Sequence, residues 1–234
     1  MVNKMSELCK WLHEQLECLP LFRYPFEPSK LPKDGIYFFY EKGEIWGHGG
    51  DKQRIVRIGT SREGNFRSRI NEHFLMKSSK GLDKDKLKPS DRSIFRKNIG
   101  RALLNRCNDP YLDIWNHDFT YLTKRERHGD ERDIDKEERI ESEITKILRT
   151  NFSFRFIVID NGTDRDRLEK LLIGTVANCG LCKPSADWLG KYSPKPKIKE
   201  KGMWLEQNLS SHPISGSNKV EIMDLIHKTK SFIP

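Results

Sequence analysis

Five side chains that can do chemistry stand on segments predicted to be ordered. They are Tyr37, Arg57, Arg69, His73 and Glu169. Hydrolysis of a phosphodiester needs an activated water, stabilisation of charge in the transition state and help for the leaving oxygen. Mg²⁺ commonly takes only one or two protein carboxylates, so a single glutamate is a sufficient protein ligand. A phenol, an imidazole, two guanidinium groups and a carboxylate could therefore cleave such a bond with a divalent metal.

Each of these residues also has a purely structural interpretation, which the sequence leaves open. Arg69 offers a planar fork to a phosphate, but it could equally form an ion pair. His73 lies four residues later, on the same helix face, and could transfer a proton, hold a phosphate or be an ordinary polar residue. Glu169 could be a solvated helix residue, and Tyr37 an ordinary strand aromatic.

The apolar spacing predicts a helix, two strands, a helix, a long helical insertion, a strand and a helix, in that order. Strands are expected over 35–40, 54–58 and 152–159. Helices are expected from a cap at Ser6 to 19, over 65–75, over 94–106 with a cap at Ser93, around 140–148, after a capping box at 163–166, and around 220–228. This order predicts an α/β (α+β) fold in which helices flank a small three-stranded mixed sheet.

The sequence resembles the GIY-YIG nuclease superfamily in the order and spacing of its motifs. Gly35, Ile36 and Tyr37 are followed by Arg57, Ile58 and Gly59, like the two-part signature of that superfamily. An arginine and a histidine then lie on the next helix, and a glutamate in a leucine-flanked setting follows the third strand. The resemblance covers residues 34–75 and 152–188, and it implies a GIY-YIG-type core with a helical insertion.

The resemblance implies roles for these positions. Tyr37 matches the general base, and Glu169 matches the single ligand of Mg²⁺ or Mn²⁺. A free phenol has a pKa of ~10, so a nearby cation is needed, and Arg57 could supply it. Arg57 itself replaces the second motif's tyrosine, as a basic residue does in some restriction enzymes of the superfamily. Thr60 follows the glycine where a basic residue is frequent, and Asp187 matches a supporting asparagine.

Positive charge is concentrated in one part of the chain. Residues 52–106 hold sixteen Lys and Arg against five Asp and Glu, a net of +11, whereas the whole chain carries +9. Such a concentration suits a polyanion, although a solvated surface is the alternative. The segment from Ser93 to Asn98, at a predicted helix start, is the candidate for groove or phosphate contact. The nucleic-acid contacts expected are Thr60, Arg92, Arg96, Lys97 and Arg101.

Composition indicates three segments and the location of the protein. We expect an N-terminal helix and connector over 1–33, a nuclease core over 34–190 with an insertion at about 76–150, and a basic extension over 191–234. No apolar stretch approaches the ~20 residues of a membrane span, which favours a cytoplasmic protein. Cys179 and Cys182 have the spacing of half a zinc site, but no second pair is suitably spaced along the chain, so a helix end with two small apolar residues is the expectation.

The predicted function is a metal-dependent endonuclease acting on DNA, most simply double-stranded DNA. The insertion takes the place of a recognisable separate DNA-binding domain, which favours a stand-alone enzyme of the restriction type. Two alternatives stay open: a non-catalytic nucleic-acid-binding module on the same fold, and a nuclease of DNA repair or RNA processing. The sequence does not distinguish a monomer from a homodimer.

Overall fold

The centre of the molecule is a four-stranded antiparallel sheet in the order β1-β4-β2-β3. We describe residues 4–75, 82 and 86–233 of a computed structural model. The strands are β1 (Phe22–Arg23), β2 (Gly35–Ile45), β3 (Gln53–Gly59) and β4 (Phe152–Val158). The three predicted strands are confirmed, and β2 pairs with both β3 and β4.

The expected mixed, three-stranded sheet is corrected in two respects. All strand pairs are antiparallel, because the chain returns through the insertion to lay β4 against β2 in the opposite direction. The proline-rich connector adds the fourth strand, since Phe22 pairs with Phe154 and Arg23 with Ser153. This edge strand is only two residues long, and the many prolines around it account for that, because proline cannot donate to a ladder.

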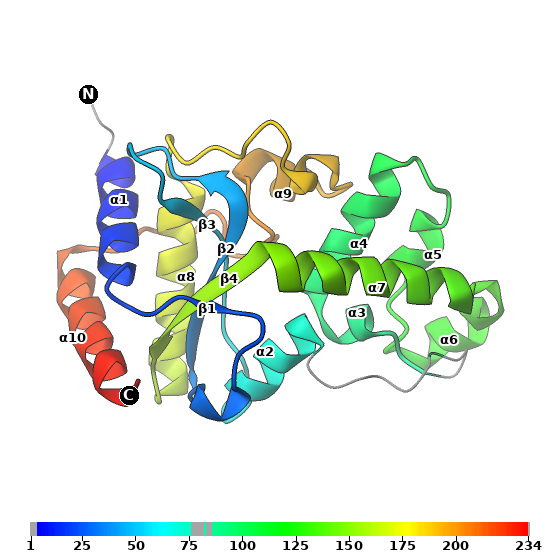
Figure 1. Cartoon of the computed structure of the whole chain (residues 1–234), viewed down its shortest axis with the longest axis horizontal. Helices are drawn as coiled ribbons and strands as arrows, with labels where there is room; N and C mark the ends of the chain where they lie inside the picture. Colours follow the sequence, from blue (N-terminus) through cyan, green and yellow to red (C-terminus); the bar gives the residue numbers. More distant parts are fainter. Residues whose placement is uncertain (1–3, 76–81, 83–85, 234) are drawn as a thin grey trace.

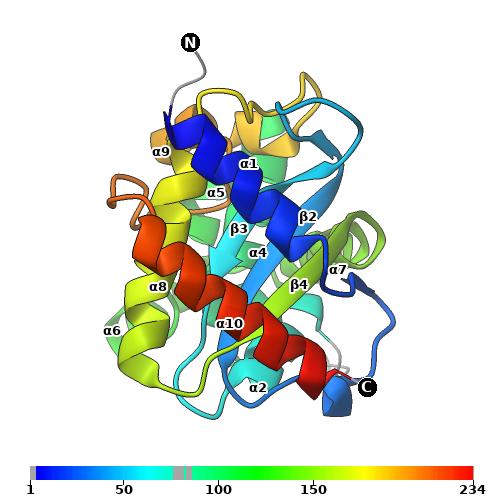
Figure 2. The same ribbon diagram turned by 90° about the vertical axis from the view of Figure 1, so that its left-hand side faces the viewer.

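One face of the sheet is covered by three helices: the first helix of the chain, the helix that follows β4 and the last helix of the chain. They are α1 (Lys4–Leu16), α8 (Gly162–Ala177) and α10 (Gly216–Phe232). Their apolar side chains pack on Ile36 and Phe38 of β2 and on Ile157 of β4. Figure 2 shows α1 and α10 lying across this face, with α8 beside them. The final helix was predicted, and it is longer than expected.

The opposite face receives alternate residues of the same strands. Tyr37 and Phe39 of β2 pack here with Phe154 of β4, because successive strand residues point to opposite faces. The covering helices are α2 (Phe66–Phe74), α4 (Ile94–Arg106) and α7 (Ile134–Asn151). The two faces therefore carry separate apolar cores, with Tyr37 in one and the apolar side chains of α8 in the other.

The insertion forms a helical lobe at one end of the molecule (Figure 1). Besides α4 and α7 it holds α3 (Pro89–Arg92), α5 (Leu112–Asn116), α6 (Leu122–His128) and η2 (Gly129–Glu131). Residues 76–81 and 83–85 of the expected insertion lie outside the described residues. The remaining short elements are η1 (Pro28–Lys30), η3 (Leu189–Tyr192) and α9 (Pro196–Lys201).

The helix caps were predicted with mixed success. The Ser93 side chain accepts a hydrogen bond from the backbone of Arg96, as expected of the α4 cap. The cap of α8 is Asn161, whose side chain accepts from Asp164, so the capping box placed at Thr163 is wrong by two residues. Ser6 lies within α1 and is buried. Among the described residues, no helix has the length and hydropathy to cross a membrane.

A buried carboxylate joins the C-terminal part of the chain to the sheet. Glu41, in β2, accepts hydrogen bonds from the indole nitrogens of Trp188 at 2.9 Å and Trp204 at 3.0 Å. Its side chain is almost fully buried. Burial raises the pKa of Glu41 from its ordinary value of 4.5 to about 7, although the two indole hydrogen bonds act in the opposite direction.

This raised pKa predicts that stability falls with pH between the unfolded and folded values. The folded state binds the Glu41 proton more tightly, so the contribution is complete below about pH 4.5 and is lost as pH rises through about 7. Glu41→Gln removes this titration but keeps an acceptor for the indoles. From pH 5 to pH 8 we expect wild type to lose about 2.5 kcal/mol of stability relative to this variant. Urea unfolding of wild type and variant at pH 5 and pH 8 measures this change. A difference in unfolding free energy between the two proteins that is the same at both pH values would contradict the prediction.

Candidate active site

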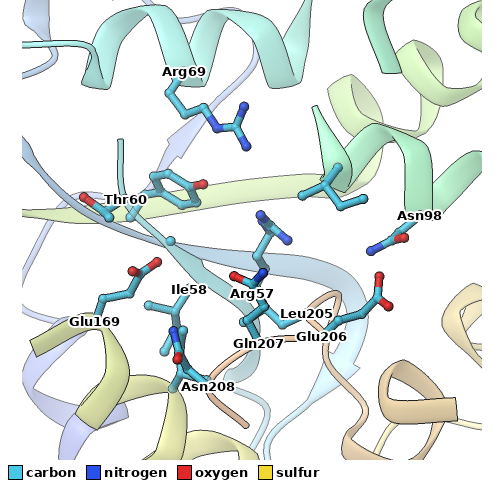
Figure 3. Close-up of a pocket in the computed structure, with 14 residues that line it drawn as sticks. Arg57, Ile58, Thr60, Arg69, Asn98, Glu169, Leu205, Glu206, Gln207 and Asn208 are labelled. Carbon is cyan, nitrogen blue, oxygen red and sulfur yellow. The ribbon is translucent and has the colours of Figure 1, made fainter. Parts of the chain in front are cut away.

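The candidate site is a pocket of about 500 Å³ beside β3, the edge strand of the sheet. Tyr37, Arg57, Thr60, Arg69 and Glu169, all singled out from the sequence, line it together. Figure 3 shows Arg69 entering from α2 and Glu169 from α8, on either side of Arg57. The other lining residues are Ile58, Gly59, Ile94, Asn98, Ile173, Leu205, Glu206, Gln207 and Asn208.

The tyrosine of the first motif lies directly over the glycine of the second. Tyr37 and Gly59 are cross-strand partners, and a Cβ on Gly59 would lie 2.4 Å from the Tyr37 hydroxyl oxygen. No side chain can be accommodated at that distance without moving the phenol. The glycine is therefore required by the close approach of Tyr37, which holds its hydroxyl at the pocket wall.

His73 contacts the Tyr37 hydroxyl from the buried side, away from the pocket. Its Nε2 is 3.1 Å from the Tyr37 hydroxyl oxygen, and its Nδ1 is 2.8 Å from the hydroxyl oxygen of Ser93. His73 is fully buried and does not line the pocket. Burial lowers the pKa of His73 well below its ordinary value, and the charges of Arg69, Arg57 and Arg96 lower it further. The imidazole is therefore neutral near pH 7 and orients Tyr37.

Arg57 places a buried positive charge near both the Tyr37 phenol and the Glu169 carboxylate. Its guanidinium donates to the Trp204 carbonyl and lies 4.9 Å from the centre of the Phe95 ring. Burial lowers the pKa of Arg57, while Tyr37 and Glu169 raise it. The guanidinium nevertheless remains charged, because arginine is not deprotonated in proteins. The positive charge of Arg57 therefore acts on both the Tyr37 hydroxyl and the Glu169 carboxylate.

Glu169 is half-buried on α8 and faces this charge. Burial raises the pKa of Glu169, whereas the Arg57 guanidinium and a hydrogen bond from the Thr60 backbone N–H lower it. Thr60 itself is held because its hydroxyl donates to the Gly35 carbonyl at 2.9 Å. The end of β3 thus fixes the Glu169 carboxylate through the backbone N–H of Thr60.

Arg69 is held in place at the mouth of the pocket. Its guanidinium donates to the carbonyl of Arg92 at 2.8 Å and to the Glu72 carboxylate at 3.2 Å. The side chain is 24% exposed, so its remaining N–H groups can reach a ligand. The ion pair that was the alternative interpretation is present, and it orients the group toward the pocket.

The sequence reasoning missed the part of the site that comes from the C-terminal segment. Glu206, Gln207 and Asn208 line the pocket although they were assigned to a separate basic extension. The signal available was a polar run directly after Met203, Trp204 and Leu205, within a tail otherwise rich in lysine and proline.

Asp187 does not support the site as expected. It is exposed and outside the pocket lining, because the longer connection after α8 carries it away from β3. Asn208 occupies the pocket wall beside Glu169 (Figure 3). Asn208, and not Asp187, therefore places a side-chain amide at the pocket wall.

The expectation that Arg96, Lys97 and Arg101 contact nucleic acid is corrected, because all three are buried. Arg96 donates to the Glu141 carboxylate at 2.7 Å, Lys97 lies 3.3 Å from Asp91, and Arg101 donates to the Asn98 amide at 2.7 Å. Arg92 is exposed at the start of the lobe. Much of the positive charge in this segment is thus compensated inside the protein by acidic and polar partners.

Comparison with protein families assigns the chain. The model of the GIY-YIG domain matches residues 2–229, nearly the whole sequence. The protein is therefore a member of the GIY-YIG nuclease superfamily. Members of this superfamily are generally divalent-metal-dependent endonucleases. Comparison with curated proteins and with solved structures gave no significant match.

The corrected role of Arg96 leads to a stability prediction. Glu141→Ala leaves the Arg96 guanidinium buried without its carboxylate, so we expect a loss of about 3 to 5 kcal/mol. Glu143→Ala is the matched control on the same helix. Glu143 is 53% exposed and lies 4.0 Å from Arg106, so its loss should change stability by less than about 1 kcal/mol. Chemical denaturation measures both, and equal effects would refute the assignment.

Proposed function

We propose that the protein is a divalent-metal-dependent endonuclease that cleaves phosphodiester bonds in double-stranded DNA. The observation that supports this is the convergence of Tyr37, Arg57, Arg69 and Glu169 in one pocket. The test is nicking of plasmid DNA with and without Mg²⁺, followed by sequencing of the ends produced from a complex DNA. A non-catalytic binding module would bind DNA without nicking it, and cleavage of RNA alone would also refute the proposal.

The pocket is suited to Mg²⁺ or Mn²⁺. Glu169 supplies a half-buried carboxylate, and the amide of Asn208 faces the same space. Glu206 forms ion pairs with Arg101 and Lys195, each at 3.8 Å. We therefore assign Glu169 as the carboxylate ligand of the metal. Waters and substrate phosphate complete such a shell. When bound, the metal polarises a phosphate oxygen and stabilises the leaving oxygen.

The proton of the attacking water goes to the Tyr37 oxygen in this proposal. The Ser93 hydroxyl oxygen accepts the Arg96 backbone N–H at 3.3 Å, so its own proton is available for Nδ1 of His73. Nε2 of His73 then carries a proton and donates it as a hydrogen bond to the Tyr37 oxygen. In this proposal Tyr37 has first released its own proton to solvent, and this bond and the Arg57 charge stabilise the phenolate that then receives the proton of the water. Arg69 binds the scissile phosphate and stabilises the developing charge.

The approach of DNA is proposed from the surroundings of the pocket. A second depression shares Glu206, Gln207 and Asn208 with it and adds Lys197 and Lys201 from α9. On the other side, Ile94 of α4 lines the pocket and is 44% exposed. A duplex lying across both would contact lysines on one side and the helical lobe on the other. That lobe is the part suited to base contacts, which supports a site-selective enzyme of the restriction type.

The metal assignment predicts the effect of one isosteric change. Glu169→Gln should abolish Mg²⁺-dependent nicking and leave DNA binding within about threefold of wild type, because it removes only the charge that holds the cation. Asp224→Asn is the control, since Asp224 is exposed on α10, lies outside the pocket lining and should have no effect. Plasmid nicking and an equilibrium binding assay provide the two measurements. A Glu169→Gln variant with full activity would rule out the assignment.

The base assignment predicts which changes affect the chemical step. Tyr37→Phe should slow single-turnover cleavage roughly 10²- to 10⁴-fold, with binding retained. Gly59→Ala should act in the same way, because its methyl group displaces the phenol. Arg57→Lys should retain more activity than Arg57→Leu, since it retains the charge. Tyr121→Phe is the control, because Tyr121 is 64% exposed. Wild-type rates in Tyr37→Phe would show that the base lies elsewhere.

A further inference from the structure

Four side chains outside the active site converge at the other end of α8. Cys9 comes from α1, His48 from the loop between β2 and β3, and Cys179 and Cys182 from the turn after α8. One ligand atom of each lies within 4.8 Å of all the others. The three cysteines are buried and His48 is half-buried. The second pair of ligands that the sequence spacing did not reveal is thus supplied by two segments distant in the chain.

The spacings match the edges of a tetrahedron around one metal ion. The sulfur atoms of Cys9 and Cys182 are 3.9 Å apart, and the Cys179 sulfur is 3.5 Å from Nε2 of His48. Zinc bonds of ~2.3 Å to sulfur and ~2.0–2.1 Å to nitrogen place tetrahedral ligands ~3.8 Å apart for two sulfurs and ~3.6 Å for sulfur and nitrogen. A disulfide would bring two sulfurs to ~2.0 Å, and it would leave the third thiol and the imidazole without a role.

The backbone around the four residues is shaped to bring them together. Gly47 donates its N–H to the Cys182 sulfur at 3.5 Å. A Cβ on Gly47 would lie 2.0 Å from the Leu181 carbonyl oxygen, so only glycine lets the loop approach the cysteine turn this closely. The neighbouring Trp46 ring packs edge-on against His48 with ring centres 5.1 Å apart, which orients the imidazole.

A second histidine beside the cluster, His13, uses both ring nitrogens in hydrogen bonds to the protein backbone. Nδ1 of His13 is 2.9 Å from the Cys9 carbonyl oxygen, and Nε2 accepts the Ile55 backbone N–H at 3.0 Å. Both nitrogens therefore have partners, and His13 supports Cys9 from outside the cluster. This leaves three sulfurs and one nitrogen as the ligands.

We propose that Cys9, His48, Cys179 and Cys182 bind one structural zinc ion. Three thiolates and an imidazole form a ligand set typical of zinc and unsuited to Mg²⁺. Each thiol releases its proton to solvent as its bond to zinc forms, with no change in oxidation state. Four protein ligands leave no position open for substrate, so the role is structural. The ion would tie α1 and the β2–β3 loop to the end of α8, the helix that carries Glu169.

The test is the zinc content of the full chain, purified without chelator or added metal and freed of any affinity tag. We expect about one zinc per chain for wild type. Cys9→Ser, Cys179→Ser and Cys182→Ser should each lose most of it. His48→Cys should retain zinc, because a four-cysteine site is also tetrahedral. Cys18→Ser and Cys107→Ser are the matched controls, since both residues are exposed and outside the cluster.

Two measurements on the wild-type chain keep the test decisive where a serine variant fails to fold. Cobalt added to the metal-free protein should give the visible absorption of a tetrahedral thiolate complex. A strong chelator should lower the Tm, since zinc binds the folded chain. Wild-type protein that contains no zinc and has an unchanged Tm with chelator would overturn the proposal, as would a disulfide within the cluster. None of these readouts involves nucleic acid, so they are independent of nuclease activity.

Discussion

The free edge of β3 is the feature on which the pocket depends. An edge strand presents unpaired backbone groups, and here the Val56 carbonyl accepts the backbone N–H of Trp204 at 2.8 Å. The Arg57 guanidinium then donates to the Trp204 carbonyl, and the Trp204 indole donates to Glu41. These contacts fix a C-terminal segment against a strand formed much earlier in the chain. The polar residues that follow Trp204 become the outer wall of the pocket as a result.

An edge strand also explains how groups from opposite faces of the sheet meet. Tyr37 belongs to the layer covered by α2, whereas α8, which carries Glu169, packs on the other layer. Beyond β3 no further strand of the described sheet separates them, so both can face Arg57. Their separation depends on how α8 is held against β3. The zinc proposed for the cysteine and histidine cluster at the end of α8 would restrain that distance and so link a structural ion to the geometry of the candidate pocket.

Buried charged side chains of the helical lobe form ion pairs within the protein. A buried cation without a partner costs several kcal/mol, and Arg96 and Lys97 are each matched by a carboxylate within 3.3 Å. Glu141, which neutralises Arg96, comes from a helix more than forty residues later, as the separation of 45 positions shows. Among the described residues of 52–106, several basic side chains are therefore buried in the fold and do not contribute to a positive surface. Of the described basic side chains, Arg57 and Arg69 line the pocket, and Lys197 and Lys201 line the depression next to it.

The sequence by itself determined the family, the main strands and helices, and the residues Tyr37, Arg57, Arg69 and Glu169 that the pocket brings together. These rest on local patterns, because strand and helix periodicities and short motifs are read within a few neighbouring residues. Only the tertiary structure decided that Arg96 is buried, that Asn208 stands where Asp187 was expected, and that Cys9 and His48 join Cys179 and Cys182. Each of these depends on a contact between residues far apart in the chain, and burial or ligation is a property of that contact rather than of either local sequence.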